Sequence, residues 1–135
     1  GDHALARVQF SKLLSDGLVN SYFQPIVDLQ TRELVAFEVL GRSHLVGLET
    51  PGRMFSVATD LQKEADLSDL LRTKGIKSSL QFTDIPHIFL NTHPSEFNRD
   101  KNWNWVKELR KLSPTNPLTV EIHEAAITDI PSMCQ

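Results

Sequence analysis

Two apolar runs near the N-terminus, Tyr22-Phe-Gln-Pro-Ile-Val-Asp-Leu29 and Leu34-Val-Ala-Phe-Glu-Val-Leu-Gly-Arg42, are separated by only four polar residues. Extended apolar runs with a short polar connection predict two strands joined as a hairpin. Pro25 has no N–H for one bond of the strand ladder, so we expect either an edge strand or a strand that begins at the proline. The chain is therefore predicted to start its sheet with this pair of strands.

Beyond the hairpin, helical and extended patterns alternate. The predicted elements are a helix over 4–15 ended by Gly17, a helix from Pro51 to Gly75, a strand over 88–91, a helix over 103–112 and a strand over 118–123. The first helix is expected to bury Leu5, Val8, Leu13 and Leu14, and another helix could begin at Ala125.

The order of these later elements predicts an α/β fold with a parallel sheet, because strands alternate with helices. Four strands are predicted in all. A closed barrel of this class needs eight strands and about 250 residues. If the chain forms a barrel, about half of that barrel is therefore expected to be missing.

Composition excludes several classes of protein. The chain has 135 residues, a net charge of −3 and 40% hydrophobic residues, which is enough for one domain with its own core. The mixed, mildly acidic charge does not favour duplex nucleic acid. We expect no membrane segment, no signal peptide and no disulfide, since Cys134 is the single cysteine. The opening Gly1 suggests a segment of a longer, cytoplasmic protein.

Three oxygen-bearing side chains, Glu38, Asn91 and Glu121, are predicted near the ends of different strands. Barrels of this class keep their active sites at the C-terminal ends of their strands. Carboxylate and amide oxygens suit Mg²⁺ or Mn²⁺ better than zinc. A structural interpretation stands beside this one. Glu38 and Arg42 lie four residues apart on one strand face and could form an ion pair, and a single Asn or Glu at a strand end is often a cap.

Four motifs follow one another across nearly the whole chain. They are Gln24-Pro-Ile-Val27, Glu38-Val-Leu-Gly-Arg42, Asn91-Thr-His-Pro94 and Glu121-Ile-His-Glu124. Together they resemble the EAL-domain family of cyclic-di-GMP phosphodiesterases, and the segment from Met54 to Thr59 is similar to the helix that follows the second motif. The resemblance implies a TIM-barrel-like EAL fold, here an incomplete barrel, with residues 1–135 as the N-terminal half of the domain.

The resemblance also implies roles for the matched residues. Glu38, Asn91 and Glu121 would bind the Mg²⁺ or Mn²⁺ ions of a two-metal site, and Glu38, Glu121 and Glu124 would be catalytic, Glu124 by supporting the site. Gln24, Leu40 and Arg42 would contact the dinucleotide, Arg42 through a phosphate. The implied reaction is metal-assisted hydrolysis of cyclic-di-GMP to linear pGpG, a step in bacterial signalling and biofilm control.

Some positions depart from the family pattern. Val39 replaces an alanine, Thr59 a glutamate, His93 a serine and His123 a threonine, and Gly41 stands where bulkier residues are common. Val39 points away from Glu38, so its change is expected to affect packing rather than metal binding. The family's later paired aspartates, lysine, glutamate and glutamine are absent from the sequence. We therefore expect no hydrolysis from the isolated chain.

Alternative functions stay open at this point. The changes at Thr59, His93 and His123 favour a degenerate module that binds cyclic-di-GMP or a protein partner without catalysis. A structural fragment with no ligand would leave a sheet edge unpaired, so self-association, such as a homodimer, is expected. The five histidines show no zinc-like spacing. Further domains of a longer parent protein are also expected.

Overall fold

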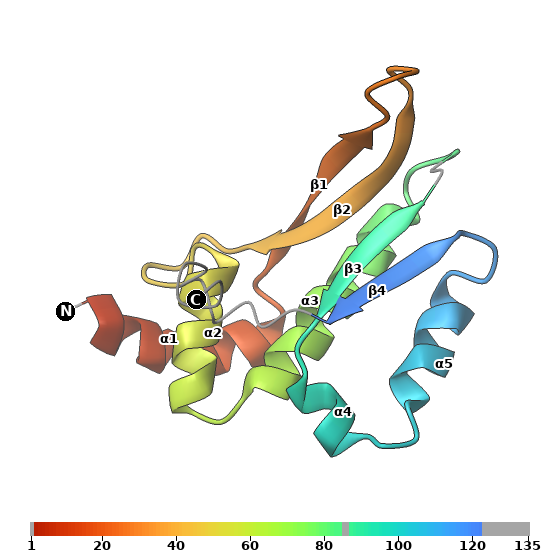
Figure 1. The fold of residues 1–135 in the computed structure, drawn as a ribbon. Coiled ribbons are helices and arrows are strands. Elements are labelled where there is room, and N and C mark those ends of the chain that lie inside the picture. The colour runs from red at the N-terminus through yellow and green to blue at the C-terminus, as the bar shows by residue number, and fades with distance from the viewer. Residues whose placement is uncertain (1, 85–86, 123–135) are drawn as a thin grey trace, which may run out of the picture.

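Helices and strands alternate through residues 2–84 and 87–122, which the computed structural model describes (Figure 1). In chain order they are α1 (Asp2–Asp16), β1 (Asn20–Val27), β2 (Leu34–Arg42), α2 (Pro51–Asp60), α3 (Glu64–Ser79), β3 (Ile88–Thr92), α4 (Ser95–Arg99), α5 (Asn104–Leu112) and β4 (Leu118–Ile122). The predicted first helix, the hairpin and the last helix–strand pair are confirmed, and Gly17 has the positive φ of 63° expected after a helix end.

The strands form one sheet in the order β1-β2-β3-β4. β1 and β2 are antiparallel, whereas β2, β3 and β4 are parallel. The crossovers between the parallel strands contain α2 with α3 and α4 with α5. This confirms the predicted α/β fold with a parallel sheet. Pro25 lies in β1, which is an edge strand of the described sheet, as its missing N–H predicted.

Two apolar clusters hold the elements together. The first joins α1, α2 and α3 and includes Phe10, Met54 and Leu67. The second lies between the sheet and helices α3 and α5 and includes Ile76 and Leu90. In Figure 1, α3 lies behind β2 and β3. Since α3 contributes to both clusters, and each buried side chain of this size contributes about 1.5–3 kcal/mol, it connects the helical end to the sheet.

The buried face of α1 differs from the predicted one. Leu5 and Val8 are exposed, and Ala6, Phe10 and Leu13 are buried instead. Positions 6, 10 and 13 also share one helix face, because they are spaced by four and three residues. The prediction was wrong for Leu5 and Val8 because it did not weigh the large aromatic side chain of Phe10, which is on the buried face.

The predicted helix from Pro51 to Gly75 is two helices. α2 ends at Asp60, Gln62 has a φ of 56°, and α3 runs from Glu64 past Gly75 to Ser79. A residue in the left-handed region cannot continue a right-handed helix, so the helical pattern is interrupted there. Gly75 does not end α3 as predicted, because it lies buried inside the helix against the sheet.

Gly75 makes room for Val39, the valine that departs from the family's usual alanine. A Cβ at position 75 would lie 2.5 Å from Val39 Cγ1. Val39 is buried in the cluster between the sheet and α3. The larger residue on β2 is therefore matched by the smallest residue on α3.

β1 ends two residues before its predicted end. Asp28 Oδ1 accepts hydrogen bonds from the N–H groups of Gln30 and Thr31 at 2.8 and 3.1 Å, which starts the turn at Asp28. Leu29 consequently lies in the turn and is exposed. The short helix α4 was not predicted. The predicted helix from Ala125 and the strand position of His123 lie outside the described residues.

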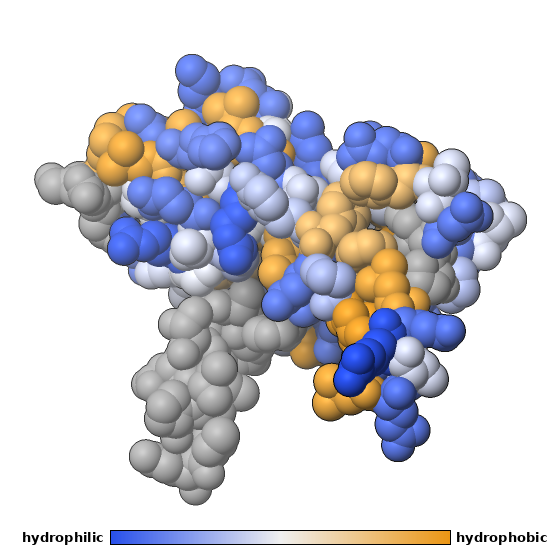
Figure 2. Space-filling view, turned by 90° about the horizontal axis from the view of Figure 1, so that it is seen from above, coloured by the Kyte–Doolittle hydropathy of each residue, from blue (hydrophilic) through white to orange (hydrophobic). Residues whose placement is uncertain are grey.

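Hydrophobic side chains are exposed near the β1–β2 turn and the loop between α3 and β3. They include Val27, Leu29, Leu34, Val35 and Phe82. Figure 2 looks down on this end of the molecule and shows hydrophobic residues gathered there. The expected self-association stays a prediction. None of the helices in the described part of the chain is long and apolar enough to cross a membrane.

Candidate functional site

β2 and β3 separate toward their C-terminal ends. Their pairing comprises Phe37 with Ile88 and Glu38 with Phe89. A pocket of about 270 Å³ lies between the ends of these strands and helices α2 and α3. It is lined by Glu38, Val39, Leu40, Gly41, Arg42, Pro51, Gly52, Phe55, Ser68, Leu71, Arg72, Leu90, Asn91, Thr92 and His93. The pocket is thus at the end of the parallel strands where barrels of this class place their active sites.

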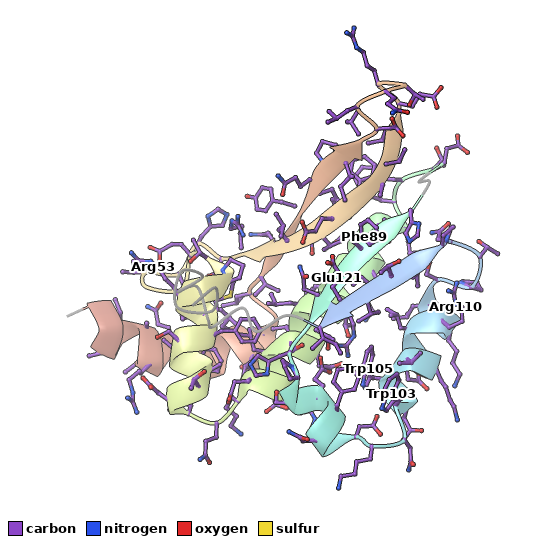
Figure 3. The ribbon with its side chains drawn as sticks, viewed as in Figure 1. Arg53, Phe89, Trp103, Trp105, Arg110 and Glu121 are labelled. Carbon is purple, nitrogen blue, oxygen red and sulfur yellow. The ribbon has the colours of Figure 1, made fainter. Side chains whose placement is uncertain are left out.

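Glu38, Asn91 and Glu121 lie together on one face of the sheet. Asn91 Nδ2 donates a hydrogen bond to Glu38 Oε2 at 3.3 Å, and Asn91 is paired in register with Glu121 on β4. The β3–β4 register places Glu121 on the same sheet face as Phe89, and both are labelled in Figure 3. The fold therefore brings together the three residues predicted as metal ligands, while that role itself stays a prediction.

The side-chain oxygen of Asn91 has no hydrogen-bond partner. Its Oδ1 is buried, and within the described ranges it is the one buried, unpaired side-chain atom that belongs to the pocket lining. Leaving a buried acceptor unpaired costs about 1–3 kcal/mol. An atom in this state is a candidate to receive a cation or a donor from a ligand.

The donor atoms around Asn91 fit a hard cation as part of a ligand set. Two carboxylates and one amide oxygen are the ligand types that Mg²⁺ and Mn²⁺ prefer. Within residues 2–84 and 87–122, no group of three or more His, Cys, Asp or Glu could hold a metal ion. A cation between Glu38 and Glu121 would therefore need Asn91 as a third donor, through its unpaired Oδ1.

Behind the same strand, Arg72 of α3 and Glu96 of α4 form a buried ion pair, with each side chain only 2% exposed. Arg72 Nη2 donates to Glu96 Oε1 at 2.9 Å, and the hydroxyls of Ser68 and Thr92 donate to Oε2. The Arg72 guanidinium lies 4.1 Å from the centre of the Trp105 ring. Burial by itself would raise the pKa of Glu96. These hydrogen bonds and the attraction of Arg72 outweigh burial, so the pKa lies below its usual value.

This network fixes the C-terminal end of β3. Thr92 Oγ1 accepts from Arg72 Nη1 at 3.1 Å and donates to Glu96 at 2.6 Å. The backbone N–H of His93 donates to Ser68 Oγ at 2.8 Å. Asn91 and His93 flank Thr92 in the chain, so the network also determines where these two pocket residues lie.

The ring of His93 lies in the pocket wall, stacked on Phe55. Their ring centres are 5.4 Å apart and the ring planes differ by 12°. The backbone N–H of Ser95 donates to His93 Nδ1 at 3.1 Å, and Ser95 Oγ lies 2.8 Å from the same nitrogen. The ring is therefore held on one side by stacking and on one edge by hydrogen bonds.

Of the three residues predicted to contact the dinucleotide, two line the pocket and one does not. Leu40 and Arg42 line the pocket, whereas Gln24 is exposed on β1, opposite Glu38 in the register. The ion pair considered between Glu38 and Arg42 is not formed, and Arg42 Nη1 donates instead to the carbonyl of Gly41 at 2.8 Å. Glu124, predicted to support the site, lies outside the described residues.

Sequence reasoning missed the helical wall of the pocket. Phe55, Ser68 and Arg72 were not predicted as pocket residues, and His93 was noted only as a departure from a family pattern. Arg72 and Glu96 lie on different helices and are 24 positions apart in the sequence, so no local spacing connects them. A charged residue within an apolar helical pattern was the available signal, since such a residue needs a partner when it is buried.

Comparison with known proteins identifies the fold. The model of the EAL domain family matches residues 7–135. No curated protein matches the chain by sequence. The match to the family model confirms the resemblance that was drawn from the four motifs.

Several solved structures are similar to this chain. The Xanthomonas citri FimX EAL domain in complex with c-diGMP has a TM-score of 0.68 at 15% identity, covering 96% of this chain and 53% of that chain. The FimX EAL domain from Pseudomonas aeruginosa bound to c-di-GMP has a TM-score of 0.67 at 19% identity, covering 98% and 54%. The PaMucR phosphodiesterase in its c-di-GMP complex has a TM-score of 0.64 at 17% identity, covering 93% and 54%. The chain spans about half the length of these TIM-barrel-like structures, and the likeness establishes its fold.

Proposed function

Because the chain belongs to the EAL domain family, we propose that it forms part of a cyclic-di-GMP site, in a domain that hydrolyses this dinucleotide to linear pGpG. The observation that carries the proposal is the convergence of Glu38, Asn91 and Glu121 beside a pocket at the strand ends. The similar FimX domains are complexes with the dinucleotide, and PaMucR is a phosphodiesterase.

Glu38, Asn91 and Glu121 are the residues that would hold Mg²⁺ or Mn²⁺. When bound, such ions lower the pKa of a water molecule and stabilise negative charge on the phosphoryl oxygens. The unpaired Oδ1 of Asn91 supports this assignment, because the amide already uses its Nδ2 toward Glu38 and has a buried acceptor to spare. Glu124 is proposed to support the site.

Leu40, Arg42 and Gln24 would bind the dinucleotide. Arg42 is the strongest candidate for a phosphate, since a guanidinium can bond two phosphate oxygens at once. Its contact with the Gly41 carbonyl uses Nη1 and leaves other donors for a ligand. Leu40 supplies apolar contact in the pocket, and Gln24 supplies a polar group from the neighbouring strand.

The proposed reaction cleaves one of the two phosphodiesters. The oxygen of water bonds to phosphorus, the bond from phosphorus to the ribose 3′ oxygen breaks, and that oxygen takes up a proton. The product is linear, with a 5′ phosphate at one end. In this chain Arg42 would orient the phosphate, and the carboxylates of Glu38 and Glu121 would fix the reacting geometry.

We propose further that residues 1–135 form the N-terminal half of the domain and that they bind the dinucleotide without hydrolysing it by themselves. The solved structures are about twice as long as this chain. The sequence lacks the paired aspartates and the lysine expected in the later part of the family's site. Turnover therefore needs residues that this sequence does not contain.

Calorimetric titration of the 135-residue chain with cyclic-di-GMP tests the proposal, first with Ca²⁺ and then with Mg²⁺. We expect cation-dependent binding that Glu38→Ala abolishes. Glu33→Ala is the matched control, because Glu33 lies in the β1–β2 turn at the other end of β2 and does not line the pocket. Equal binding by both variants, or no binding by the unaltered chain with either cation, would contradict the proposal.

A further inference from the structure

Nε2 of His93 is a polar group in the pocket that the proposed function does not use. His93 lines the pocket beside Asn91 and Thr92. Its other ring nitrogen, Nδ1, is occupied by Ser95, whereas Nε2 bonds to no residue in the described part of the chain and is not sealed from solvent. Nε2 is therefore the ring nitrogen of His93 that remains for a ligand in the pocket that this residue lines.

The surroundings of His93 determine which ring nitrogen carries the proton. The backbone N–H of Ser95 points its hydrogen at Nδ1, so Nδ1 acts as an acceptor. In a neutral imidazole one nitrogen accepts and the other donates. A neutral His93 ring would consequently carry its proton on Nε2 and offer an N–H donor there.

Stacking holds this donor in place. Phe55 lies nearly parallel to the His93 ring, and the His93 backbone is held by Ser68 of the buried network. A donor held at both its backbone and its ring loses little conformational entropy when a ligand binds. The serine that the family usually has at this position could serve the Ser95 N–H, but its short side chain would then offer no second group to the pocket.

We infer that His93 is a further ligand-binding residue of this chain, donating a hydrogen bond from Nε2–H to a phosphate oxygen of cyclic-di-GMP; this inference rests on the proposed function. A phosphate oxygen is the chosen acceptor because it is anionic, and hydrogen bonds to charged acceptors are stronger than those between neutral groups. Arg42 lines the same pocket and would favour the same anion.

The competing interpretation is that His93 only caps the start of α4 through Nδ1. Two substitutions separate the roles, because asparagine places an acceptor near the position of Nδ1 and glutamine places a donor near that of Nε2. His93→Asn keeps the cap and loses the pocket donor, whereas His93→Gln keeps a pocket donor and loses the cap.

The experiment measures cyclic-di-GMP affinity by calorimetry with Ca²⁺, and the thermal unfolding midpoint, for the 135-residue chain and both variants. We expect about tenfold weaker binding for His93→Asn with an unchanged midpoint, and binding within about threefold of the unaltered chain for His93→Gln. The reverse pattern, with normal binding by His93→Asn, would overturn the inference while leaving the proposed function standing.

Two further outcomes are decisive. Nitrogen-15 correlation spectra of the unaltered chain should show the His93 proton on Nε2, and a proton on Nδ1 would overturn the inference whatever the affinities are. If the unaltered chain binds no cyclic-di-GMP with either cation, the proposed function fails and this inference fails with it.

Discussion

The two faces of β3 carry polar side chains in opposite states. Thr92 points to the sheet face covered by α3, away from the face that carries Glu38, Asn91 and Glu121. There it joins a network in which Arg72, Glu96 and Ser68 are hydrogen-bonded. Asn91, one residue earlier, points to the opposite face, and its side-chain oxygen is buried without a hydrogen-bond partner. The buried polar atoms of the Thr92 network are therefore hydrogen-bonded without any ligand, whereas the Asn91 oxygen is not.

Whether a buried polar group has its hydrogen-bond partners therefore separates structural from functional residues on this strand. A buried ion pair with all its hydrogen bonds made holds helices and strand in place. An unpaired buried acceptor next to carboxylates reduces stability unless something binds to it. Stability and ligand binding should therefore respond separately to substitutions one position apart.

The largest effect is expected from Glu96→Ala. Removing this carboxylate leaves the Arg72 guanidinium buried without its partner, which costs about 3–5 kcal/mol of unfolding free energy. Denaturant unfolding measures the loss. Asp69→Ala is the matched control, because Asp69 pairs with the same arginine at 2.9 Å but is 52% exposed, and it should cost at most about 1 kcal/mol. If Glu96→Ala and Asp69→Ala lost equal unfolding free energy, the buried ion pair would contribute no more than the exposed one.

A smaller effect is expected from Gly75→Ala, which tests packing on the same side of the sheet. The added Cβ would lie 2.5 Å from Val39 Cγ1, so we expect a loss of about 1–3 kcal/mol. Val39→Ala should restore most of that loss in the double variant, because it removes the methyl groups in the way. If the double variant is no more stable than Gly75→Ala alone, Val39 is not the source of the strain.

Acid should weaken the network in a defined pH range. The pKa of Glu96 is lowered in the folded chain from its ordinary 4.5. Its contribution to stability is therefore complete above about pH 4.5 and is lost as the pH falls through the folded pKa. Unfolding free energy measured between pH 7 and pH 3 should decline in this range, and less steeply in Glu96→Gln. If the unaltered chain and Glu96→Gln lost stability in parallel, Glu96 would not be the group that makes stability depend on pH in this range.

The smallest effect on stability is expected from Asn91→Ala. The substitution removes a long hydrogen bond of 3.3 Å to Glu38, but it also removes the unpaired buried oxygen, so the unfolding free energy should change by less than about 1 kcal/mol. Cation-dependent binding of cyclic-di-GMP should nevertheless be lost. A large loss of stability would show that Asn91 is structural, like its neighbour Thr92.

The sequence alone predicted much of the fold. The hairpin around residues 30–33 and the strands that begin at residues 88 and 118 could be predicted, because strand periodicity and turn residues are local features. The motifs also predicted that Glu38, Asn91 and Glu121 belong to one site, and these residues do lie together on one sheet face. Their roles as ligands stay predictions.

Local patterns failed where packing between distant elements decides the outcome. The break at Gln62 and the continuation of α3 through Gly75 were missed, because the helical pattern continues across both positions. On α1, several apolar residues could have formed the buried face, and contact with α2 and α3 selects Phe10. Spacing along one helix cannot show which face meets a neighbour.

The sequence by itself determined the class of the fold and the succession of helices and strands, since these follow from local patterns, and it gave the residue types of the site. Only the tertiary structure decided that Asn91 keeps an unpaired oxygen and that Arg72 and Glu96 satisfy each other. The physical reason is that a polar group's state depends on its partner, and most of these partners come from other elements of the fold.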